Sequence, residues 1–374
     1  MKDVIYFDNA ATTSLSAAAL SAMTETLSTI YGNPSSTHAT GREAARVLRE
    51  ARQEIATALA TKPQYIYFTA GGTESDNTAI KGYALAHQDQ GKHIISTSIE
   101  HHAVLETLEY LEENFGFEVT LIKPENNVIT AQQIKEALRP DTILVSTMYA
   151  NNETGYILPI KEIGEILADH PAAFHVDAVQ AMGKLPIHPE ELGIDMLSAA
   201  GHKFHGPKGV GFLYAKDVKL TKLLHGGSQE DKRRAGTENL PGIVGMAKAL
   251  TENLAHWQEN LDHVQKVAAT ILENLDPDSY YLNQQEPHLP HVLNIGFPGQ
   301  SNDSLLLRLD LAGVAVSTGS ACTAGAIEPS HVLASFYGEN SPKLKESIRI
   351  SLSELNTQEE ALLFTQKLKD IIGG

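Results

Sequence analysis

The sequence predicts an α/β protein with a mostly parallel central sheet, and two observations lead to this prediction. Between residues 65 and 214, short apolar runs alternate with longer amphipathic segments. The apolar runs are nearly continuous, without the polar alternation of a strand that faces water on one side. Strands of this kind are covered by helices on both faces, as in a parallel sheet with crossover helices.

The amphipathic segments predict helices, and the apolar runs predict strands, in this first part of the chain. Helices are expected at residues 16–30, 41–60, 74–88, 103–115, 131–138 and 160–169. Strands are expected at residues 65–68, 93–98, 117–123, 142–148, 173–177, 196–199 and 209–214. No repeat or low-complexity tract interrupts this order.

The pattern changes after one long helical stretch at residues 242–275. Beyond it, strands are expected at residues 292–297, 314–317 and 347–352, and helices at residues 304–311 and 358–371. We expect a domain boundary inside the long helix, near His256.

Composition and charge restrict the classes of function. The 374 residues include 29 Lys and Arg against 46 Asp and Glu, a formal net charge of −17. A chain of this charge is repelled by nucleic acid and by anionic membranes, apart from the short basic run at residues 232–234. No apolar run of transmembrane length occurs, and residues 1–9 do not form a signal peptide, so the cytoplasm is expected. The single cysteine, Cys322, excludes an internal disulfide and a zinc site built on cysteine pairs, and it suits a reducing compartment.

A glycine-rich turn follows the expected strand at residues 65–68. Residues 69–75 read TAGGTES and open the next helix. Glycines let backbone N–H groups approach an anion, and a helix N-terminus adds positive partial charge. The turn therefore predicts a phosphate cradle, although an ordinary turn with a threonine N-cap fits equally well. It lacks the Gly-Lys-Ser/Thr ending of a P-loop.

Two further strands lead into residues that suit a cofactor. Asp177 ends the strand at residues 173–177, where open α/β sheets bind ligands, and a carboxylate there would keep a pyridine nitrogen protonated. Lys203 follows the strand at residues 196–199, and its amine would form a Schiff base if nearby positive charge lowered its pKa. The alternatives are a helix-capping aspartate and a solvated surface lysine.

The only cysteine lies among small residues between two glycines, in the segment STGSACTAG at residues 317–325. Free cysteines are most often buried and inert. This segment, however, has no bulky apolar residues that would bury one. Its composition indicates a mobile loop that presents a reactive thiol at Cys322.

These pieces and several others occur together and in order in the NifS/IscS-type cysteine desulfurases, which the chain resembles over nearly its whole length. The matching segments are residues 6–12 (YFDNAAT), 32–36 (GNPSS), 71–77 (GGTESDN), 100–101 (EH), 151–155 (NNETG), 177–180 (DAVQ), 202–203 (HK), 233–239 (RRAGTEN), 320–322 (SAC) and 349–351 (RIS).

The resemblance implies a fold-type-I enzyme that uses pyridoxal 5'-phosphate, in the class-V aminotransferase-like group. It implies a large cofactor-binding domain, residues 13–256, with the mostly parallel sheet. A smaller α+β domain would combine residues 1–12 with residues 257–374 and carry the Cys322 loop. Enzymes of this family are homodimers with active sites at the subunit interface.

Roles around the cofactor ring follow from the resemblance, motif by motif. Lys203 would form the Schiff base, and Asp177 would pair with the ring nitrogen. Gln180 would hydrogen-bond the phenolic oxygen. His101 would stack on the ring, chosen over His102 because it directly follows Glu100. The alternative for His101 is a structural histidine.

The resemblance also assigns the phosphate and the substrate. Gly72, Thr73 and His202 would hold the phosphate, joined by Thr237 of the neighbouring subunit. Asn152 and Arg349 would bind the substrate carboxylate, with Asn152 also near the cofactor. A planar guanidinium suits a bidentate grip on a carboxylate, although Arg349 could instead form a surface ion pair.

Two positions depart from the family pattern. Ala200 stands where the family usually has serine, two residues before His202, so one hydroxyl donor to the phosphate is expected to be missing. Leu352 is followed by Ser353 where the family commonly has glycine, which leaves the local turn unassigned.

The implied reaction converts L-cysteine to L-alanine. The Lys203 amine would remove the Cα proton, and the Cys322 thiolate would attack the substrate sulfur to form a persulfide. Residues 323–330 resemble the longer-loop class I branch, which delivers sulfur to an acceptor protein for iron–sulfur clusters or tRNA thiolation. The alternatives are a selenocysteine lyase, an aminotransferase, or a non-catalytic regulator that binds the cofactor.

Overall fold

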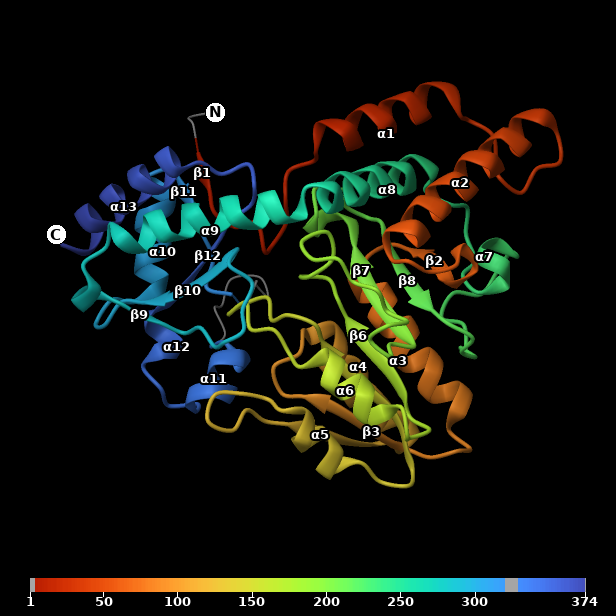
Figure 1. Cartoon of the computed structure of the whole chain (residues 1–374), viewed down its shortest axis with the longest axis horizontal. Coiled ribbons are helices and arrows are strands. Elements are labelled where there is room, and N and C mark those ends of the chain that lie inside the picture. Colours follow the sequence, from red (N-terminus) through yellow and green to blue (C-terminus); the bar gives the residue numbers. More distant parts are fainter. Residues whose placement is uncertain (1–3, 320–328, 374) are drawn as a thin grey trace.

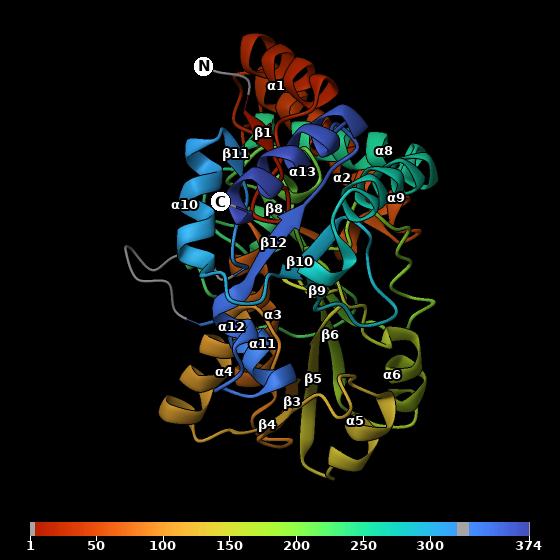
Figure 2. The same ribbon diagram turned by 90° about the vertical axis from the view of Figure 1, so that its left-hand side faces the viewer.

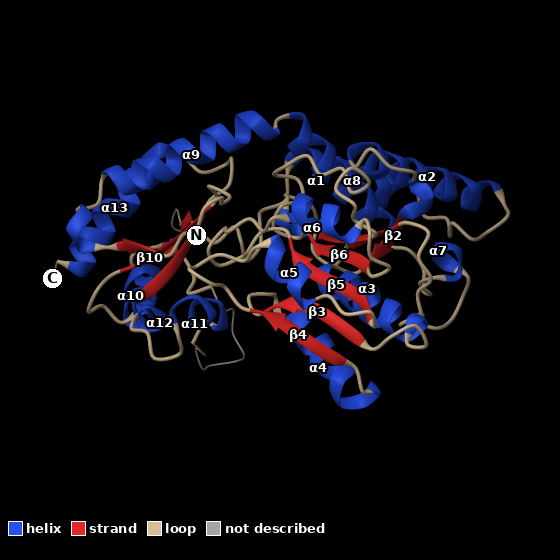
Figure 3. Ribbon diagram, turned by 60° about the horizontal axis from the view of Figure 1, so that its bottom comes forward, coloured by secondary structure: helices blue, strands red, loops and turns tan. Residues whose placement is uncertain are grey.

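A seven-stranded sheet forms the centre of the larger part of the molecule (Figures 1 and 3). In the computed structural model, which describes residues 4–319 and 329–373, its strands lie in the order β2-β8-β7-β6-β5-β3-β4. β8 is antiparallel to both neighbours and the other adjacent pairs are parallel, which confirms the prediction of a mostly parallel sheet. The strands are β2 (Ile66–Thr69), β3 (His93–Thr97), β4 (Glu118–Ile122), β5 (Thr142–Met148), β6 (Ala173–Asp177), β7 (Met196–Ala200) and β8 (Gly211–Ala215).

Helices cover both faces of this sheet (Figure 3). They are α1 (Ala17–Thr29), α2 (Ala39–Ala58), α3 (Gly72–His87), α4 (His102–Phe115), α5 (Ala131–Ala137), α6 (Ile160–Leu167), α7 (Gln229–Lys232) and α8 (Leu240–Ala255). Short 3₁₀ turns, η1 (Pro63–Tyr65) and η2 (Gly201–Lys203), precede β2 and follow β7.

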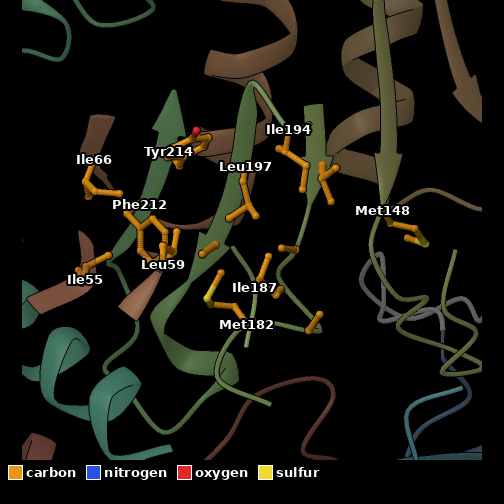
Figure 4. Packing of buried hydrophobic residues seen from close by; sticks show 14 of the residues in the cluster. Ile55, Leu59, Ile66, Met148, Met182, Ile187, Ile194, Leu197, Phe212 and Tyr214 are labelled. Atoms are coloured by element: carbon orange, nitrogen blue, oxygen red, sulfur yellow. The ribbon is translucent and has the colours of Figure 1, made fainter. Parts of the chain in front are cut away.

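Alternate residues of a strand enter different hydrophobic clusters. On β8, Phe212 and Tyr214 belong to the cluster formed with α2 and α8, whereas Leu213 and Ala215 belong to the cluster formed with α3 and α4. The separation follows from the two-residue period of a strand. Figure 4 shows Ile55 of α2 and Leu59, which follows this helix, beside Phe212 in the first cluster. Burial on both faces explains why these strands are apolar throughout.

The long helix expected at residues 242–275 is two helices, so that prediction was wrong. α8 ends at Ala255 and α9 (Trp257–Glu273) begins two residues later. His256 between them has φ −121° and ψ 15°, outside the helical region. α8 lies over the seven-stranded sheet, and α9 continues over the second part of the molecule (Figure 1). The break falls where we expected a domain boundary, and the division into two domains stays a proposal.

The second part, which faces the viewer in Figure 2, contains two small sheets. β9 (Tyr281–Leu282), β10 (Val292–Gly296) and β12 (Ser347–Ser351) form an antiparallel sheet, and β1 (Ile5–Tyr6) pairs in parallel with β11 (Val314–Ala315). Its helices are α9, η3 (Pro277–Ser279), α10 (Asn302–Leu311), α11 (His331–Tyr337), α12 (Lys343–Glu346) and α13 (Gln358–Ile372).

The first residues of the chain share a core with its last helix. Ile5 and Phe7 are buried in the same cluster as Val267 of α9, Ile350 of β12 and Phe364 of α13. The rings of Phe7 and Phe364 meet edge to face, with centroids 5.5 Å apart and an interplanar angle of 70°. This core positions the N-terminal segment between the two parts.

The elements that the sequence did not predict are short. β1, β9, α7, α11 and α12 each span fewer than eight residues, too few to show a hydrophobic period. None of the helices in the described part of the chain has both the length and the apolar composition needed to cross a bilayer.

Phe364→Ala should lower the free energy of unfolding by about 3–5 kcal/mol, because it removes a fully buried ring and leaves a cavity beside Phe7. Equilibrium urea denaturation would measure this loss. Leu311→Ala is the control, since that side chain is 80% exposed and its removal should change stability by less than about 0.5 kcal/mol. Equal losses in the two variants would contradict the shared core.

Candidate active site

A cavity of about 290 Å³ lies at the carboxyl ends of β5, β6 and β7, which contribute Met148, Asp177 and Ala200. This edge of an α/β sheet is where such folds bind ligands. Among the described residues, all of the site residues predicted from the sequence line it except Thr237. Its wall consists of Ala10, Ala11, Gly72, Thr73, Asp76, His101, His102, Met148, Ala150, Asn152, Glu153, Asp177, Val179, Gln180, Ala200, His202, Lys203, Gly319, His331 and Arg349.

Lys203 stands at the end of η2, directly after β7. Its Nζ donates to the carbonyl oxygens of Ala10 at 2.5 Å and Ala11 at 3.0 Å. Burial lowers the pKa of this amine to about 7, helped by the positive charges of Arg349 and Lys184 and opposed by Asp177 and Asp8. The lysine is therefore not the solvated side chain of the alternative interpretation. A large fraction is neutral, and hence nucleophilic, near pH 7.

Lys184 contacts the backbone of Lys203. Its Nζ donates to the carbonyl oxygen of Lys203 at 3.0 Å. Burial lowers the pKa of Lys184 to about 8, and Glu354 opposes this shift. Both lysines border a second, smaller cavity behind the first, which also contains Glu354 and His205. The sequence analysis did not identify Lys184, because nothing distinguishes it locally from a surface lysine.

Asp177 ends β6 and faces the same cavity. Its Oδ1 accepts the backbone N–H of Val179 at 2.9 Å, and burial raises its pKa to about 6 against the opposing charge of Lys203. Asp76 of α3 is a second buried acid in the wall, which the sequence analysis missed. Burial and the charge of Asp177 raise the pKa of Asp76, and among the described residues its Oδ1 accepts no hydrogen bond.

His101 is both a structural histidine and a residue of the cavity wall, the two alternatives that the sequence left open. It caps α4, since its Nδ1 accepts the backbone N–H of Ala103 at 3.0 Å, and it also lines the cavity. Burial lowers its pKa to about 4, so the ring is neutral at pH 7. Gln180 lies opposite in the wall and donates from Nε2 to the carbonyl oxygen of Ala10 at 3.0 Å.

The start of α3 forms an anion-binding turn. Gly71 is the N-cap with φ +154°, a conformation that favours glycine, and no side chain caps the helix. The first N–H groups of α3, at Gly72 and Thr73, are thus available at the positive end of a helix of 16 residues. The threonine N-cap of the alternative interpretation is not present here. A Cβ built on Gly72 would lie 3.6 Å from the Cβ of Ala200, so this departure from the family pattern borders the cradle.

Arg349 of β12 is buried, with 2% exposure, and does not form the surface ion pair of the alternative interpretation. Its Nη2 donates to Asp8 Oδ1 at 2.9 Å, and its Nη1 donates to the carbonyl oxygen of Asn152 at 3.0 Å. Its buried Nε has no hydrogen-bond acceptor in the part of the chain that the structure describes. That free N–H suits an added anion such as a carboxylate.

Thr237 is the predicted residue that the described structure places away from the cavity wall. Thr237 borders a separate cavity with Phe68, Glu230 and Arg234. Cys322 lies outside the described residues, and Gly319, three residues before it, lines the main cavity. Within the described ranges, no group of three or more His, Cys, Asp or Glu side chains is arranged to hold a metal ion.

The residues present fit pyridoxal 5'-phosphate. An amine with a lowered pKa suits its aldehyde, a carboxylate suits its ring nitrogen, and an uncapped helix N-terminus suits its phosphate. All three occur in the wall of one cavity.

Comparisons with known proteins agree with this combination of fold and site. The model of the family "Aminotransferase class-V" matches residues 5–364. The chain belongs to this family, among its IscS-type cysteine desulfurases.

The similarity extends over the whole chain. This chain is 51% identical to "Putative cysteine desulfurase IscS 1" of Bacillus subtilis (strain 168), and the match covers 98% of both chains. It is 45% identical to "Cysteine desulfurase IscS" of Methanosarcina thermophila, covering 98% of this chain and 92% of that protein.

Among solved structures, a "NifS-like protein" matches with a TM-score of 0.93 and 37% identity over 99% of both chains. "SspA in complex with cysteine" matches with a TM-score of 0.83 and 36% identity, covering 94% of this chain and all of that one. The fold-type-I expectation is confirmed by these neighbours.

The reaction of the Lys203 amine with pyridoxal phosphate should accelerate as pH rises through about 7 and level off above it, because only the neutral amine attacks an aldehyde. Lys184→Met should move this midpoint to higher pH, since it removes one positive charge that lowers the pKa of Lys203. Stopped-flow absorbance of the cofactor-free protein at several pH values measures both midpoints.

Lys248→Met is the matched control for the lysine variant. Lys248 pairs with Glu54 at 2.7 Å, with 46% of its side chain exposed, and it should leave the midpoint unchanged. A wild-type midpoint near 10, the ordinary range for lysine, would contradict the role of burial.

Proposed function

We propose that this protein is a cysteine desulfurase that converts L-cysteine to L-alanine and transfers the sulfur to Cys322 as a persulfide. One observation carries the proposal. A single cavity places the amine of Lys203, the carboxylate of Asp177 and the guanidinium of Arg349 in one wall with Gly319, which stands just before the Cys322 segment. The names of its full-length relatives support the same activity.

The proposed cofactor is pyridoxal 5'-phosphate, which when bound draws electrons from the substrate and makes its Cα proton acidic. Gly72, Thr73 and His202 would hold the phosphate. Asp177 would pair with the ring nitrogen, Gln180 with the phenolic oxygen, and neutral His101 would lie against the ring. The methyl group of Ala200 borders the cradle without a donor, so the backbone N–H groups of α3 would carry more of the phosphate binding.

Arg349 and Asn152 would bind the carboxylate of L-cysteine. The free Nε of Arg349 supplies a donor, while Asp8 and the Asn152 carbonyl hold the two Nη atoms in place. A guanidinium fixed in this way loses little conformational entropy when the substrate binds. Lys203, with its amine partly neutral at pH 7, would take the Cα proton.

Cys322 is within covalent reach of the cavity. It follows Gly319 of the cavity wall by three residues in the sequence, and three fully extended residues span at most about 11 Å. Its thiolate would attack the sulfur of the substrate. The S–S bond forms as the Cβ–S bond breaks, and the electron pair of the broken bond stays with the carbon fragment. That fragment takes up a proton at Cβ, regains a proton at Cα from Lys203 and leaves as L-alanine.

We further propose a homodimer that delivers sulfur to an acceptor protein in the cytoplasm. Thr237 borders a cavity other than the main one of its own chain, which is compatible with phosphate binding in the active site of the neighbouring subunit. A role that needs a free thiol on the only cysteine suits a reducing compartment. The chemistry of the acceptor is that of a thiol, on a scaffold for iron–sulfur clusters or on a tRNA-thiolating enzyme.

Cys322→Ala should keep the visible absorbance of the bound cofactor but lower alanine and sulfide production from L-cysteine by at least roughly two orders of magnitude, because the nucleophile is lost. The measurement is alanine formed per subunit in the presence of a thiol reductant. Lys203→Ala should abolish both the absorbance and the turnover.

Full sulfur release by Cys322→Ala would reject the persulfide role. If the wild-type protein instead transferred the amino group of L-cysteine to a keto acid, the aminotransferase alternative would replace the desulfurase. Release of selenide alone, with L-selenocysteine as substrate, would favour a selenocysteine lyase. A protein that binds the cofactor but changes none of these substrates would be a regulator.

A further inference from the structure

Glu153 is a buried acid in the cavity wall to which the reaction assigns no role. It is 2% exposed and follows Asn152 in the turn after β5. The turn is rigid, because Asn151 Oδ1 accepts the backbone N–H groups of Glu153 at 2.9 Å and Thr154 at 3.0 Å. The carbonyl oxygen of Glu153 accepts from Asn294 Nδ2 on β10 at 3.1 Å. The backbone that carries this carboxylate is therefore held in place.

That carboxylate contacts residues on both sides of the Cys322 segment. Ser330, just after the segment, donates its hydroxyl to Glu153 Oε2 and accepts the backbone N–H of Leu333 at 3.0 Å, which caps α11. Gly319, just before the segment, packs against the same oxygen. A Cβ built on Gly319 would lie 2.8 Å from Glu153 Oε2.

Gly319 is constrained by more than this one contact. Its φ of +103° favours glycine, and the side chain of Glu153 leaves no room for a Cβ. Arg349 Nη1 lies 3.4 Å from the carbonyl oxygen of Gly319 and 3.0 Å from that of Asn152. Gly319 is thus held between an acid and a guanidinium that both belong to the cavity wall.

We propose that Glu153 is a positioning residue for sulfur transfer, because one oxygen of its carboxylate fixes Gly319 and Ser330, which lie on either side of the segment that carries Cys322. This inference rests on the proposed desulfurase activity. The proposal separates two functions within the site. Lys203 and Arg349 act on the substrate without Glu153, whereas the delivery of the thiol depends on it.

The surroundings of Glu153 are consistent with a carboxylate that holds polar partners. Burial raises its pKa, while the hydroxyl of Ser330 and the charges of Arg349 and His102 oppose the rise. A buried acid that is satisfied by a hydroxyl and faced by a guanidinium keeps its geometry better than an exposed one. Loss of the carboxylate would leave the Ser330 hydroxyl buried without this acceptor.

The test separates two steps of the reaction in the cofactor-loaded protein. Exchange of the Cα proton of L-alanine with D₂O reports Lys203 and the cofactor, and it needs no thiol. Persulfide formation on Cys322 in a single turnover with L-cysteine reports sulfur transfer, and mass spectrometry of the intact protein measures it. The variants are Glu153→Ala, Glu153→Gln and Ser330→Ala, with apparent melting temperatures recorded for each.

Glu153→Ala and Ser330→Ala should slow persulfide formation about 10- to 100-fold, the cost of a misplaced reacting group, while proton exchange changes less than about threefold. Glu153→Gln keeps a side-chain oxygen that accepts the Ser330 hydroxyl, so its rate should lie between those of the alanine variant and the wild type. Asp195→Asn is the matched control. That acid accepts the N–H of Phe174 at 2.8 Å and lies outside the cavity wall, so both rates should stay unchanged.

An equal fall in both rates, or an unchanged rate of persulfide formation, would overturn the positioning role. If Glu153→Ala does not fold, Glu153→Gln and Ser330→Ala decide the question by the same ratio of rates. A wild-type protein that exchanges the proton but forms no persulfide would refute the desulfurase activity, and this inference with it.

Discussion

The site depends on the N-terminal segment at residues 8–13, which joins the two parts of the molecule through its backbone and side chains. On one side, Asp8 pairs with Arg349, and the backbone N–H of Ala10 donates to Ser351 Oγ at 2.9 Å. On the other side, the carbonyl oxygens of Ala10 and Ala11 accept from Lys203. The amine of Lys203 and the guanidinium of Arg349 therefore have their positions fixed by one short peptide.

Burial in the cavity shifts the pKa values of Asp177 and Lys203. Burial raises the pKa of Asp177 to about 6 and lowers that of Lys203 to about 7. Because burial disfavours the charged form of acids and bases alike, one dry cavity moves their pKa values toward each other. A base that is ready to accept a proton thus exists beside an acid that remains largely ionised at pH 7.

The sequence predicted much of the fold and several residues of the cavity wall for a physical reason. Lys203, Asp177 and Gly72 each stand where a strand ends or a helix begins, and the carboxyl ends of parallel strands meet at one edge. The strands could be located as continuous apolar runs, because burial on both faces makes them apolar throughout. The break at His256 was not predictable by the same means, since α8 and α9 both keep a helical pattern up to it.

Residues that act through distant contacts escaped prediction. Glu153 meets Ser330 across 177 positions, and Asp8 meets Arg349 across 341. Both acids lie in segments that matched the family, but a motif shows which residues occur together and not which atoms they touch. Lys184 has no local signal at all, because its burial comes from the packing of the second cavity.

The pairing of Asp8 with Arg349 also determines when the site can form during synthesis. A ribosome releases the N-terminal segment first, yet its partners on β12 emerge only near the end of translation. Until then the segment lacks its contacts to Arg349 and Ser351 and is held only by partners in the larger part, such as Gln180 and His202. Such long-range closure is slow. A nascent chain that has folded its seven-stranded sheet would therefore have an incomplete cavity, so cofactor capture is expected only after the chain has left the ribosome.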